Sequence, residues 1–332
     1  MRHQNPTMKK GGLIILLSFS MLFFGACQKQ HTSPGPDSDS AVATRVPLLD
    51  LGSATYRGFA GGLYPNGSNQ RPPAHNAAGV AIAQGIKPLD AAGVPDEAGR
   101  IVWMSIGMSN TTQETQVFLS RMQSYPEKNP KLLLIDGAEG GQDINAINSA
   151  TAPYWNTVAN RLTAAGATAA QVQVVWYKEA EAQPTDTAFA TYPLALKEKY
   201  KSVMQLLKAK FPNLKLVYLS SRAYAGYATS KLNPEPFAWY TGWTVKWLIE
   251  DQIKGEPSLD YSGTHPSAAW LSWGPYFWAN GTTPRSDGLT WEASDFQSDG
   301  THPSTSGRQK VAQLLLDFFA TDETTKPWFL KP

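Results

Sequence analysis

The stretch IVWMSIGMSN, residues 101–110, decides the fold class of this 332-residue chain. Its first six residues are mostly apolar, with branched and aromatic side chains, which is typical of a parallel strand covered on both faces. The next four residues, GMSN, form a turn, and an amphipathic, helix-like segment follows at residues 112–122. A buried strand that leads through a turn into a helix indicates a parallel α/β sheet.

The same alternation continues to the C-terminus. We expect further buried strands at residues 131–135, 172–177 and 214–219, and a fifth, less distinct strand within residues 269–277. We expect helices at residues 152–165, 194–211, 237–254 and 307–319. Alternating strands and helices predict one α/β domain over residues 101–332, with right-handed crossovers. Since ligands bind at the carboxyl ends of strands in such sheets, residues just after a strand are the functional candidates.

The first 27 residues are typical of an export signal. Basic residues form its start, and residues 13–26 form an uncharged apolar run that is shorter than the about 20 residues needed to span a bilayer. The string FGAC, residues 24–27, resembles the end of a bacterial lipoprotein signal, although Phe24 stands where an aliphatic residue is usual. That resemblance implies a signal peptide at residues 1–26, a lipid on Cys27 and anchoring of the exported protein to the bacterial cell envelope. The alternative is an ordinary signal peptide, in which Cys27 is incidental.

Two segments separate the signal from the α/β domain. Residues 27–44 are polar after the cysteine and predict a flexible tether. Residues 45–100 are rich in glycine and proline and predict an irregular arm packed on the domain, in which His75 is an ordinary loop histidine. Three of the 29 basic residues and none of the 27 acidic ones lie in residues 1–26, so the mature chain has a net charge of −1. This balance does not favour nucleic acid as a partner.

Ser109 is the candidate nucleophile because it follows the first predicted strand. A serine at a strand-to-helix turn exposes its hydroxyl, although a serine that only caps the helix also fits the pattern. Three glycines lie within residues 137–141, after the second predicted strand. Gly140 and Gly141 are therefore candidates for a backbone N–H that stabilises an oxyanion, and a simple tight turn is the alternative.

Asp299 and His302 form the candidate acid–base pair, directly before the last predicted helix. An aspartate three residues before a histidine can bond one ring nitrogen and leave the other free to face a serine. The string GTHPS occurs twice, at residues 263–267 and 300–304. Only the second copy has an aspartate before it, since Ser262 precedes the first, so we expect catalysis at His302 and a structural role for His265.

Together these strings resemble the SGNH (GDSL-type) hydrolases, and among them the carbohydrate O-acetyl esterases of the sialate-esterase type. The four blocks occur in family order, and the resemblance covers roughly residues 100–320: GMSN at 107–110, GGQDI at 140–144, WYKEAE at 176–181 and DGTH at 299–302. The resemblance implies a flavodoxin-like, three-layer α/β/α sandwich with about five parallel strands. It also implies ester hydrolysis through an acyl-serine, with Ser109, Asn110, Gly140 and Gly141 around the oxyanion and the substrate.

The third block departs from the family pattern. Lys178 stands where the family has glutamine, and Glu179 stands where it has glycine. A lysine could replace a neutral oxyanion donor on electrostatic grounds. The alternative is that Lys178 pairs with Glu179, Glu181 or another acid and has no part in the oxyanion hole.

The expected substrate is an acetyl ester on a polysaccharide or oligosaccharide outside the cytoplasm. Trp239, Trp243 and Trp247 share one helix face, which favours a place in the core over a sugar-binding surface. Arg222, after the fourth predicted strand, could meet an anionic sugar group or form an ordinary surface salt bridge. The alternatives to a carbohydrate esterase are a lipid or acyl-chain esterase and a non-catalytic carbohydrate-binding lipoprotein.

The chain lacks the usual nucleotide, zinc and nucleophile-elbow motifs, so no metal or other cofactor is expected.

Overall fold

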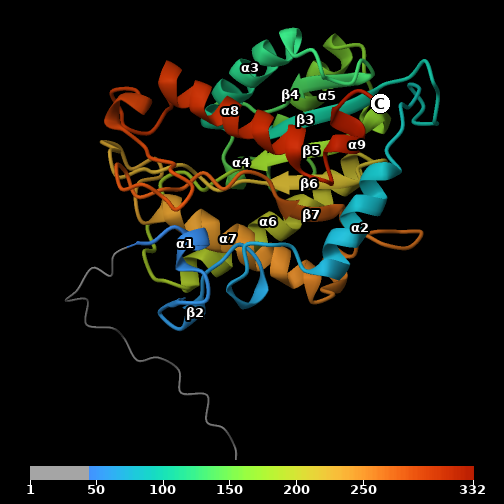
Figure 1. Ribbon diagram of the computed structural model, residues 1–332. Coiled ribbons are helices and arrows are strands. Elements are labelled where there is room, and N and C mark those ends of the chain that lie inside the picture. Colours follow the sequence, from blue (N-terminus) through green and yellow to red (C-terminus); the bar gives the residue numbers. More distant parts are fainter. Residues whose placement is uncertain (1–44) are drawn as a thin grey trace, which may run out of the picture. The chain divides into compact units, whose positions relative to one another are not determined.

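A computed structural model describes residues 45–332, and its centre is a five-stranded parallel sheet (Figure 1). The predictions for the signal peptide, for Cys27 and for the tether lie outside the described residues. The strands run in the spatial order β4-β3-β5-β6-β7 and all neighbouring pairs are parallel. Numbered along the chain this order is 2-1-3-4-5, which is the flavodoxin-like order. The strands are β3 (Ile101–Gly107), β4 (Leu132–Asp136), β5 (Val172–Lys178), β6 (Leu216–Leu219) and β7 (Trp270–Trp273).

Helices cover both faces of this sheet, which makes the domain a three-layer α/β/α sandwich as expected. One face packs against α3 (Ser109–Ser124), α8 (Thr305–Thr321) and α9 (Lys326–Phe329). The other face packs against α5 (Tyr154–Ala164), α6 (Thr191–Lys210) and α7 (Phe237–Ile253). Figure 1 shows the sheet between α3 and α8 on one side and α6 and α7 on the other.

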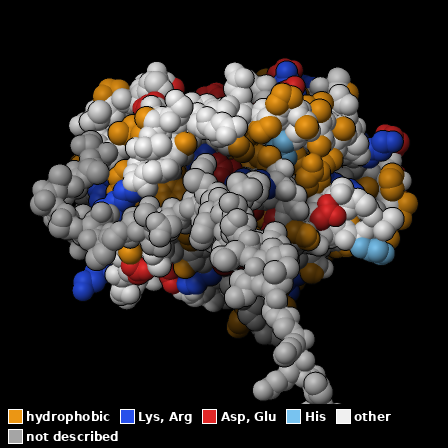
Figure 2. Space-filling view, turned by 90° about the horizontal axis from the view of Figure 1, so that it is seen from below, with side chains coloured by type: hydrophobic (Ala, Val, Ile, Leu, Met, Phe, Trp, Pro, Cys, Tyr) orange, Lys and Arg blue, Asp and Glu red, His pale blue; other side chains and the backbone are white. Residues whose placement is uncertain are grey.

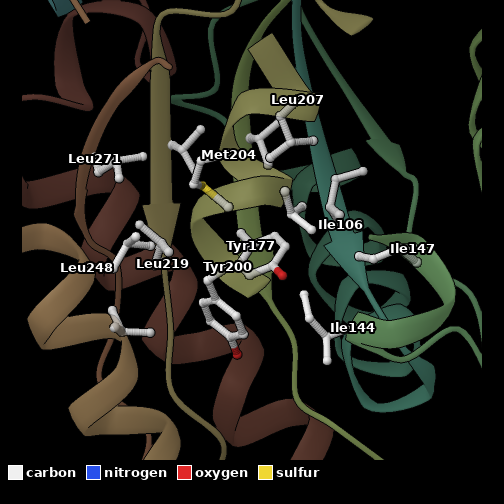
Figure 3. Close-up of a cluster of buried hydrophobic side chains, with 14 of the residues drawn as sticks. Ile106, Ile144, Ile147, Tyr177, Tyr200, Met204, Leu207, Leu219, Leu248 and Leu271 are labelled. Carbon is white, nitrogen blue, oxygen red and sulfur yellow. The ribbon is translucent and has the colours of Figure 1, made fainter. Parts of the chain in front are cut away.

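The strands read as continuous apolar runs because alternate side chains enter two separate cores. On β3, Val102, Met104 and Ile106 belong to the core under α5, α6 and α7, part of which Figure 3 shows. Ile101 and Trp103 belong to the core under α3 and α8. Since both faces are buried, no polar alternation marks these strands.

The predicted strands and helices are confirmed within two or three residues at most ends. The fifth strand, β7, has four residues, which explains why turn residues blurred its signal. The tryptophan stripe on α7 is part of the core, as expected, because Trp239 and Trp243 are fully buried and Trp247 is 8% exposed.

Residues 45–100 differ from the expected irregular arm. This segment contains a 12-residue helix, α2 (Pro73–Gln84), and His75 lies on that helix rather than in a loop. His75 is buried, its ring stacks on Trp270, and its Nε2 donates to the Leu271 carbonyl oxygen at 2.8 Å. The other elements of this segment are short: α1 (Leu48–Leu51), β1 (Thr55–Tyr56), β2 (Phe59–Ala60) and a 3-10 turn at Pro65–Gly67.

Side chains bond the outer edge of β7, which is an end strand of the sheet. Gln252 on α7 accepts from the Leu271 N–H at 2.7 Å and donates to the Ala269 carbonyl oxygen at 2.9 Å. His75 on α2 donates to the Leu271 carbonyl oxygen. Amide and imidazole groups therefore take the places that a sixth strand would occupy.

No helix within residues 45–332 is long and apolar enough to cross a membrane. Where Figure 2 colours the side chains by type, hydrophobic side chains lie among interspersed acidic and basic ones.

The remaining short elements are α4 (Ile144–Ile147) and 3-10 turns at Ala169–Gln171, Pro257–Leu259 and Ala293–Asp295.

Candidate active site

Ser109 lies where β3 passes into α3, at the carboxyl end of the sheet. It is the first residue of α3, so its backbone N–H belongs to the first turn, which has no intrahelical acceptor. Gly107 makes this turn possible, because a Cβ at that position would lie 2.2 Å from the Lys178 carbonyl oxygen on β5. The close approach of β3 and β5 thus requires glycine two residues before the serine.

The predicted acid–base pair meets this serine. His302 Nε2 lies 2.8 Å from Ser109 Oγ, and His302 Nδ1 lies 2.5 Å from Asp299 Oδ2. The three side chains form one chain of hydrogen bonds although 193 positions of sequence separate Ser109 from His302. This is the arrangement in which a histidine can remove the serine proton while an aspartate holds the ring.

The loop before α8 fixes Asp299 toward the ring. Its Oδ1 accepts from the backbone N–H groups of Thr301 at 2.9 Å and His302 at 3.0 Å. Partial burial acts to raise the pKa of Asp299, but the hydrogen bonds from the His302 ring and these two N–H groups outweigh it. The pKa therefore lies below its usual value and the carboxylate stays charged.

Gly300 allows this loop to pack on its neighbour. Its φ is +62°, and a Cβ there would lie 1.8 Å from the carbonyl oxygen of Tyr227, in the segment between β6 and α7. Asp299 also accepts, through its backbone carbonyl, from the Thr229 N–H at 3.0 Å. The loop that carries Asp299 and His302 thus rests on residues 227–229.

The two candidate oxyanion glycines differ in position. A Cβ on Gly140 would lie 3.7 Å from the Ser109 Cβ, so the backbone of Gly140 lies against Ser109. Gly141 has a φ of +76°, and a Cβ there would meet nothing within 4 Å. The turn is fixed to the sheet, since the Glu139 N–H donates to the Gly107 carbonyl oxygen at 2.9 Å. Gly140 is the better placed of the two.

Lys178 is paired with an acid, which was the alternative to a role in the oxyanion hole. The partner is Glu114 on α3. Lys178 Nζ lies 2.6 and 2.5 Å from the two carboxylate oxygens, and both residues are buried. Lys178 also lies over the ring of Phe277, with Nζ 5.6 Å from the ring centre. Within residues 45–332, Lys178 forms no ion pair with Glu179 or Glu181, the two acids considered in the sequence analysis. Glu181 pairs with Lys199 instead.

The sequence interpretation missed Glu114, although a signal was present. Glu114 lies on the buried face of α3 with Thr111, Thr115, Phe118 and Met122, at helical spacing. A charged residue on such a face needs a buried partner.

Glu179 is fully buried at the end of β5. Its Oε1 accepts from the Ala180 N–H at 2.9 Å, and its Oε2 has no hydrogen-bond partner among the described residues. Burial raises the pKa of Glu179 well above its usual value, while Arg222 and Lys178 oppose the shift. A neutral carboxyl is the form that this environment favours.

Asn110 and Arg222 bond each other in the interior, so Arg222 does not form the surface salt bridge considered above. Arg222 is 3% exposed, and its Nη1 donates to Asn110 Oδ1 at 3.1 Å. Asn110 Nδ2 donates to the Thr301 carbonyl oxygen at 2.8 Å. With both ends of its amide bonded, Asn110 connects α3 to the loop that carries His302, and its side chain is not free to serve as the substrate-binding group that the resemblance implied.

His265 is far from this site in the topology. It lies on the exposed loop before β7, and the start of a parallel strand lies at the opposite edge of the sheet from its end. The duplicated GTHPS string therefore has two unlike environments. Within residues 45–332, no group of three His, Cys, Asp or Glu side chains is arranged to hold a metal ion.

No protein-family model and no curated protein matches the chain. Among solved structures, an inferred acylhydrolase from Bacteroides fragilis is similar at 14% identity, with a TM-score of 0.39, over 74% of this chain and 97% of that one. An inferred GDSL-like lipase from Parabacteroides merdae is similar at 12% identity, with a TM-score of 0.32, over 65% of this chain and 94% of that one. The salicylyl-acyltransferase SsfX3 of a tetracycline biosynthetic pathway is similar at 11% identity, with a TM-score of 0.33, over 68% of this chain and 56% of that one. At such identities neither activity nor substrate carries over to this chain.

Proposed function

We propose that this chain is a carboxylic-ester hydrolase of the SGNH (GDSL) type, with Ser109 as its nucleophile. The observation that carries the proposal is the unbroken chain of hydrogen bonds from Ser109 through His302 to Asp299. The predicted nucleophile and the predicted acid–base pair, which are far apart in the sequence, lie in the order and at the distances that nucleophilic acyl transfer needs.

The first half of the reaction forms an acyl-serine. His302 Nε2 takes the proton from Ser109 Oγ as that oxygen bonds to the ester carbon, and the carbonyl electrons move to its oxygen. When the tetrahedral intermediate collapses, the bond to the alcohol oxygen breaks and His302 gives its proton to the leaving alkoxide. Asp299 keeps the ring oriented and stabilises the imidazolium between these transfers.

The second half regenerates the serine. His302 takes a proton from water as the water oxygen attacks the acyl carbon. The second intermediate then releases the carboxylic acid, and Ser109 Oγ recovers a proton from His302. No cofactor takes part in this sequence of steps.

The oxyanion is bound by the backbone N–H groups of Ser109 and Gly140. Ser109 has a first-turn N–H, and Gly140 lies against its side chain. The ammonium of Lys178 is bound by Glu114, so we do not assign it to the oxyanion hole. One such donor is worth about 10²–10³ in kcat in known hydrolases.

We propose an acetyl ester on an extracytoplasmic polysaccharide or oligosaccharide as the substrate. The export signal and the likeness of the four sequence blocks to carbohydrate O-acetyl esterases support this choice. Tyr224 and Tyr227, which are partly exposed beside the catalytic loop, offer rings on which a sugar can stack.

Labelling with a fluorophosphonate probe tests the nucleophile. The wild type and a Ser124→Ala control, changed at the far end of the same helix, should react, whereas Ser109→Ala should not. Acetate release from acetylated glycans should follow the same pattern. A labelled Ser109→Ala protein with full esterase activity would refute the assignment.

A chain-length series tests the substrate. p-Nitrophenyl acetate should be hydrolysed with a higher kcat/KM than the butyrate and decanoate esters. A preference for decanoate would identify a lipid or acyl-chain esterase instead. Glycan binding by a wild type that the probe never labels would identify a non-catalytic carbohydrate-binding protein.

We also propose that the protein is exported and lipid-anchored through Cys27. Metabolic labelling with a fatty-acid analogue should modify the wild type and leave Cys27→Ser unmodified. Export without any lipid on the wild type would favour the ordinary signal peptide.

A further inference from the structure

We propose that Asn110 and Arg222 are positioning residues that hold the nucleophile turn and the catalytic histidine loop together. This inference rests on the proposed function of Ser109 and His302. Asn110 directly follows Ser109, and Thr301, whose carbonyl oxygen accepts from Asn110 Nδ2 at 2.8 Å, directly precedes His302. One buried amide therefore joins the neighbours of the two residues that exchange a proton.

The two partners of Asn110 determine which way its amide points. A guanidinium has only donors, so Arg222 Nη1, at 3.1 Å, must face the amide oxygen. The carbonyl of Thr301 only accepts, so it must face the amide nitrogen. If the amide rotated by a half-turn, a donor would face a donor and an acceptor would face an acceptor. Arg222 thus keeps Asn110 in the orientation that holds the histidine loop.

Burial makes this arrangement stiff. Asn110, Arg222 and Thr301 are 5%, 3% and 1% exposed, so a group that lost its partner would be left out of contact with bulk water. These three residues, with Glu114 and Lys178, line a cavity of about 10 Å³, which has room for about one water molecule. A rearranged side chain would therefore find little space.

The consequence concerns the distance between Ser109 Oγ and His302 Nε2. The two residues belong to different segments, α3 and the loop before α8, so their separation depends on how those segments are joined. A displacement of about 1 Å between reacting groups lowers a rate about 10²-fold. Removing the Asn110 bond should therefore lower kcat more than it affects substrate binding.

The change Asn110→Asp tests the role with an almost isosteric side chain. One carboxylate oxygen can still accept from Arg222, but the other faces the Thr301 carbonyl and cannot donate. Using p-nitrophenyl acetate, we expect kcat and the fluorophosphonate labelling rate to fall about 10²-fold, with KM changed less than about twofold.

Asn129→Asp is the matched control. Asn129 is also 5% exposed, and its Nδ2 donates to the Trp328 carbonyl oxygen at 3.1 Å, near the start of β4 at the opposite edge of the sheet. This control should lose a similar amount of thermal stability and keep the wild-type kcat. Equal kcat values for Asn110→Asp, Asn129→Asp and the wild type would overturn the positioning role.

Substitution of Arg222 provides a second test, which decides the matter if Asn110→Asp does not fold. Lysine has only donors and can still orient the amide, whereas methionine cannot. Arg222→Lys should therefore keep a clearly higher kcat than Arg222→Met, at similar KM. If the two variants have the same kcat, the proposal is wrong.

The wild-type result separates this proposal from the function on which it rests. A wild type that is neither labelled at Ser109 nor active refutes the proposed function, and the positioning role falls with it. A labelled, active wild type together with unaffected Asn110 and Arg222 variants refutes the positioning role alone.

Discussion

The ammonium of Lys178 lies 2.6 Å from one carboxylate oxygen of Glu114, and both side chains are 2% exposed. Burial lowers the pKa of Lys178, and Glu114 opposes that shift by favouring the charged form. The carboxylate of Glu114, on α3, therefore stabilises the charged form of Lys178 at the end of β5.

We expect Glu114→Gln to lower the free energy of unfolding by about 3–5 kcal/mol, since it leaves Lys178 buried without a counter-charge. Urea denaturation measures the loss. Glu198→Gln is the control, because Glu198 pairs with Lys201 at the surface and is 58% exposed, so its loss should stay below about 1 kcal/mol. Similar losses for both variants would contradict the importance of burial. The double change Lys178→Met with Glu114→Leu should destabilise less than Glu114→Gln alone.

The duplicated GTHPS string provides a test of the base within one chain. His302→Ala should lower kcat by at least about 10³-fold, because Ser109 loses its proton acceptor. His265→Ala should leave kcat and Tm unchanged, since His265 is exposed on the loop before β7. Kinetics on an acetyl ester decide between the two histidines, and activity lost in His265→Ala would reverse their assignment.

Gly300→Ala should impair both folding and activity. The added Cβ would meet the Tyr227 carbonyl oxygen at 1.8 Å, so the loop that carries Asp299 and His302 must move. Gly288→Ala is the control, because its φ of +86° is also positive but a Cβ there meets nothing within 4 Å. We expect a loss of about 1–2 kcal/mol for the control and a larger loss, with lower kcat, for Gly300→Ala. Thermal unfolding and kcat are measured for both variants. Equal losses for Gly300→Ala and Gly288→Ala would mean that the contact with Tyr227 adds nothing to the cost of the positive φ.

His75 should make the protein sensitive to mild acid. Burial lowers the pKa of His75 below its usual value of 6.5, so the folded state binds this proton more weakly than the unfolded state. The resulting stability is present above pH 6.5 and is lost as the pH falls through the folded pKa. His75→Gln keeps a donor for the Leu271 carbonyl and does not titrate. Between pH 7 and 5 the Tm of the wild type should fall more than that of His75→Gln, and parallel curves would contradict this account.

The sheet could be predicted because its strands are buried on both faces. Runs such as residues 101–106 and 172–177 are short, apolar and bounded by turn residues, so strand order along the chain was evident. The cluster of Ser109, His302 and Asp299 could be predicted because Asp299 and His302 are close in sequence, because Ser109 lies just after a strand, and because the four sequence blocks resemble the SGNH pattern.

The helix α2 could not be predicted from the glycine and proline content of its region. Pro73 is at the first helical position, where a missing N–H is harmless. Gly79 allows close packing, since a Cβ there would lie 2.3 Å from the ring of Trp270. Pro73 and Gly79, two of the residues whose type disfavours a helix, therefore fit well at their positions in α2.

The bonds around Asn110 also lay beyond the sequence. Arg222 is 112 positions away and Thr301 is 191 positions away, so only the folded sheet brings them together. Neither a motif nor a helical period indicated that Arg222 is buried.

The side-chain bonds along β7 have a consequence for how copies of this protein behave toward one another. A bare end strand is a template on which another chain can add its own strand, and this is a common route to aggregation. Here Gln252 and His75 already occupy the Leu271 N–H and carbonyl groups. A shortened form that began at β3 would keep Gln252 on this edge but lose His75, so the Leu271 carbonyl oxygen would be free to accept from another chain and self-association should increase.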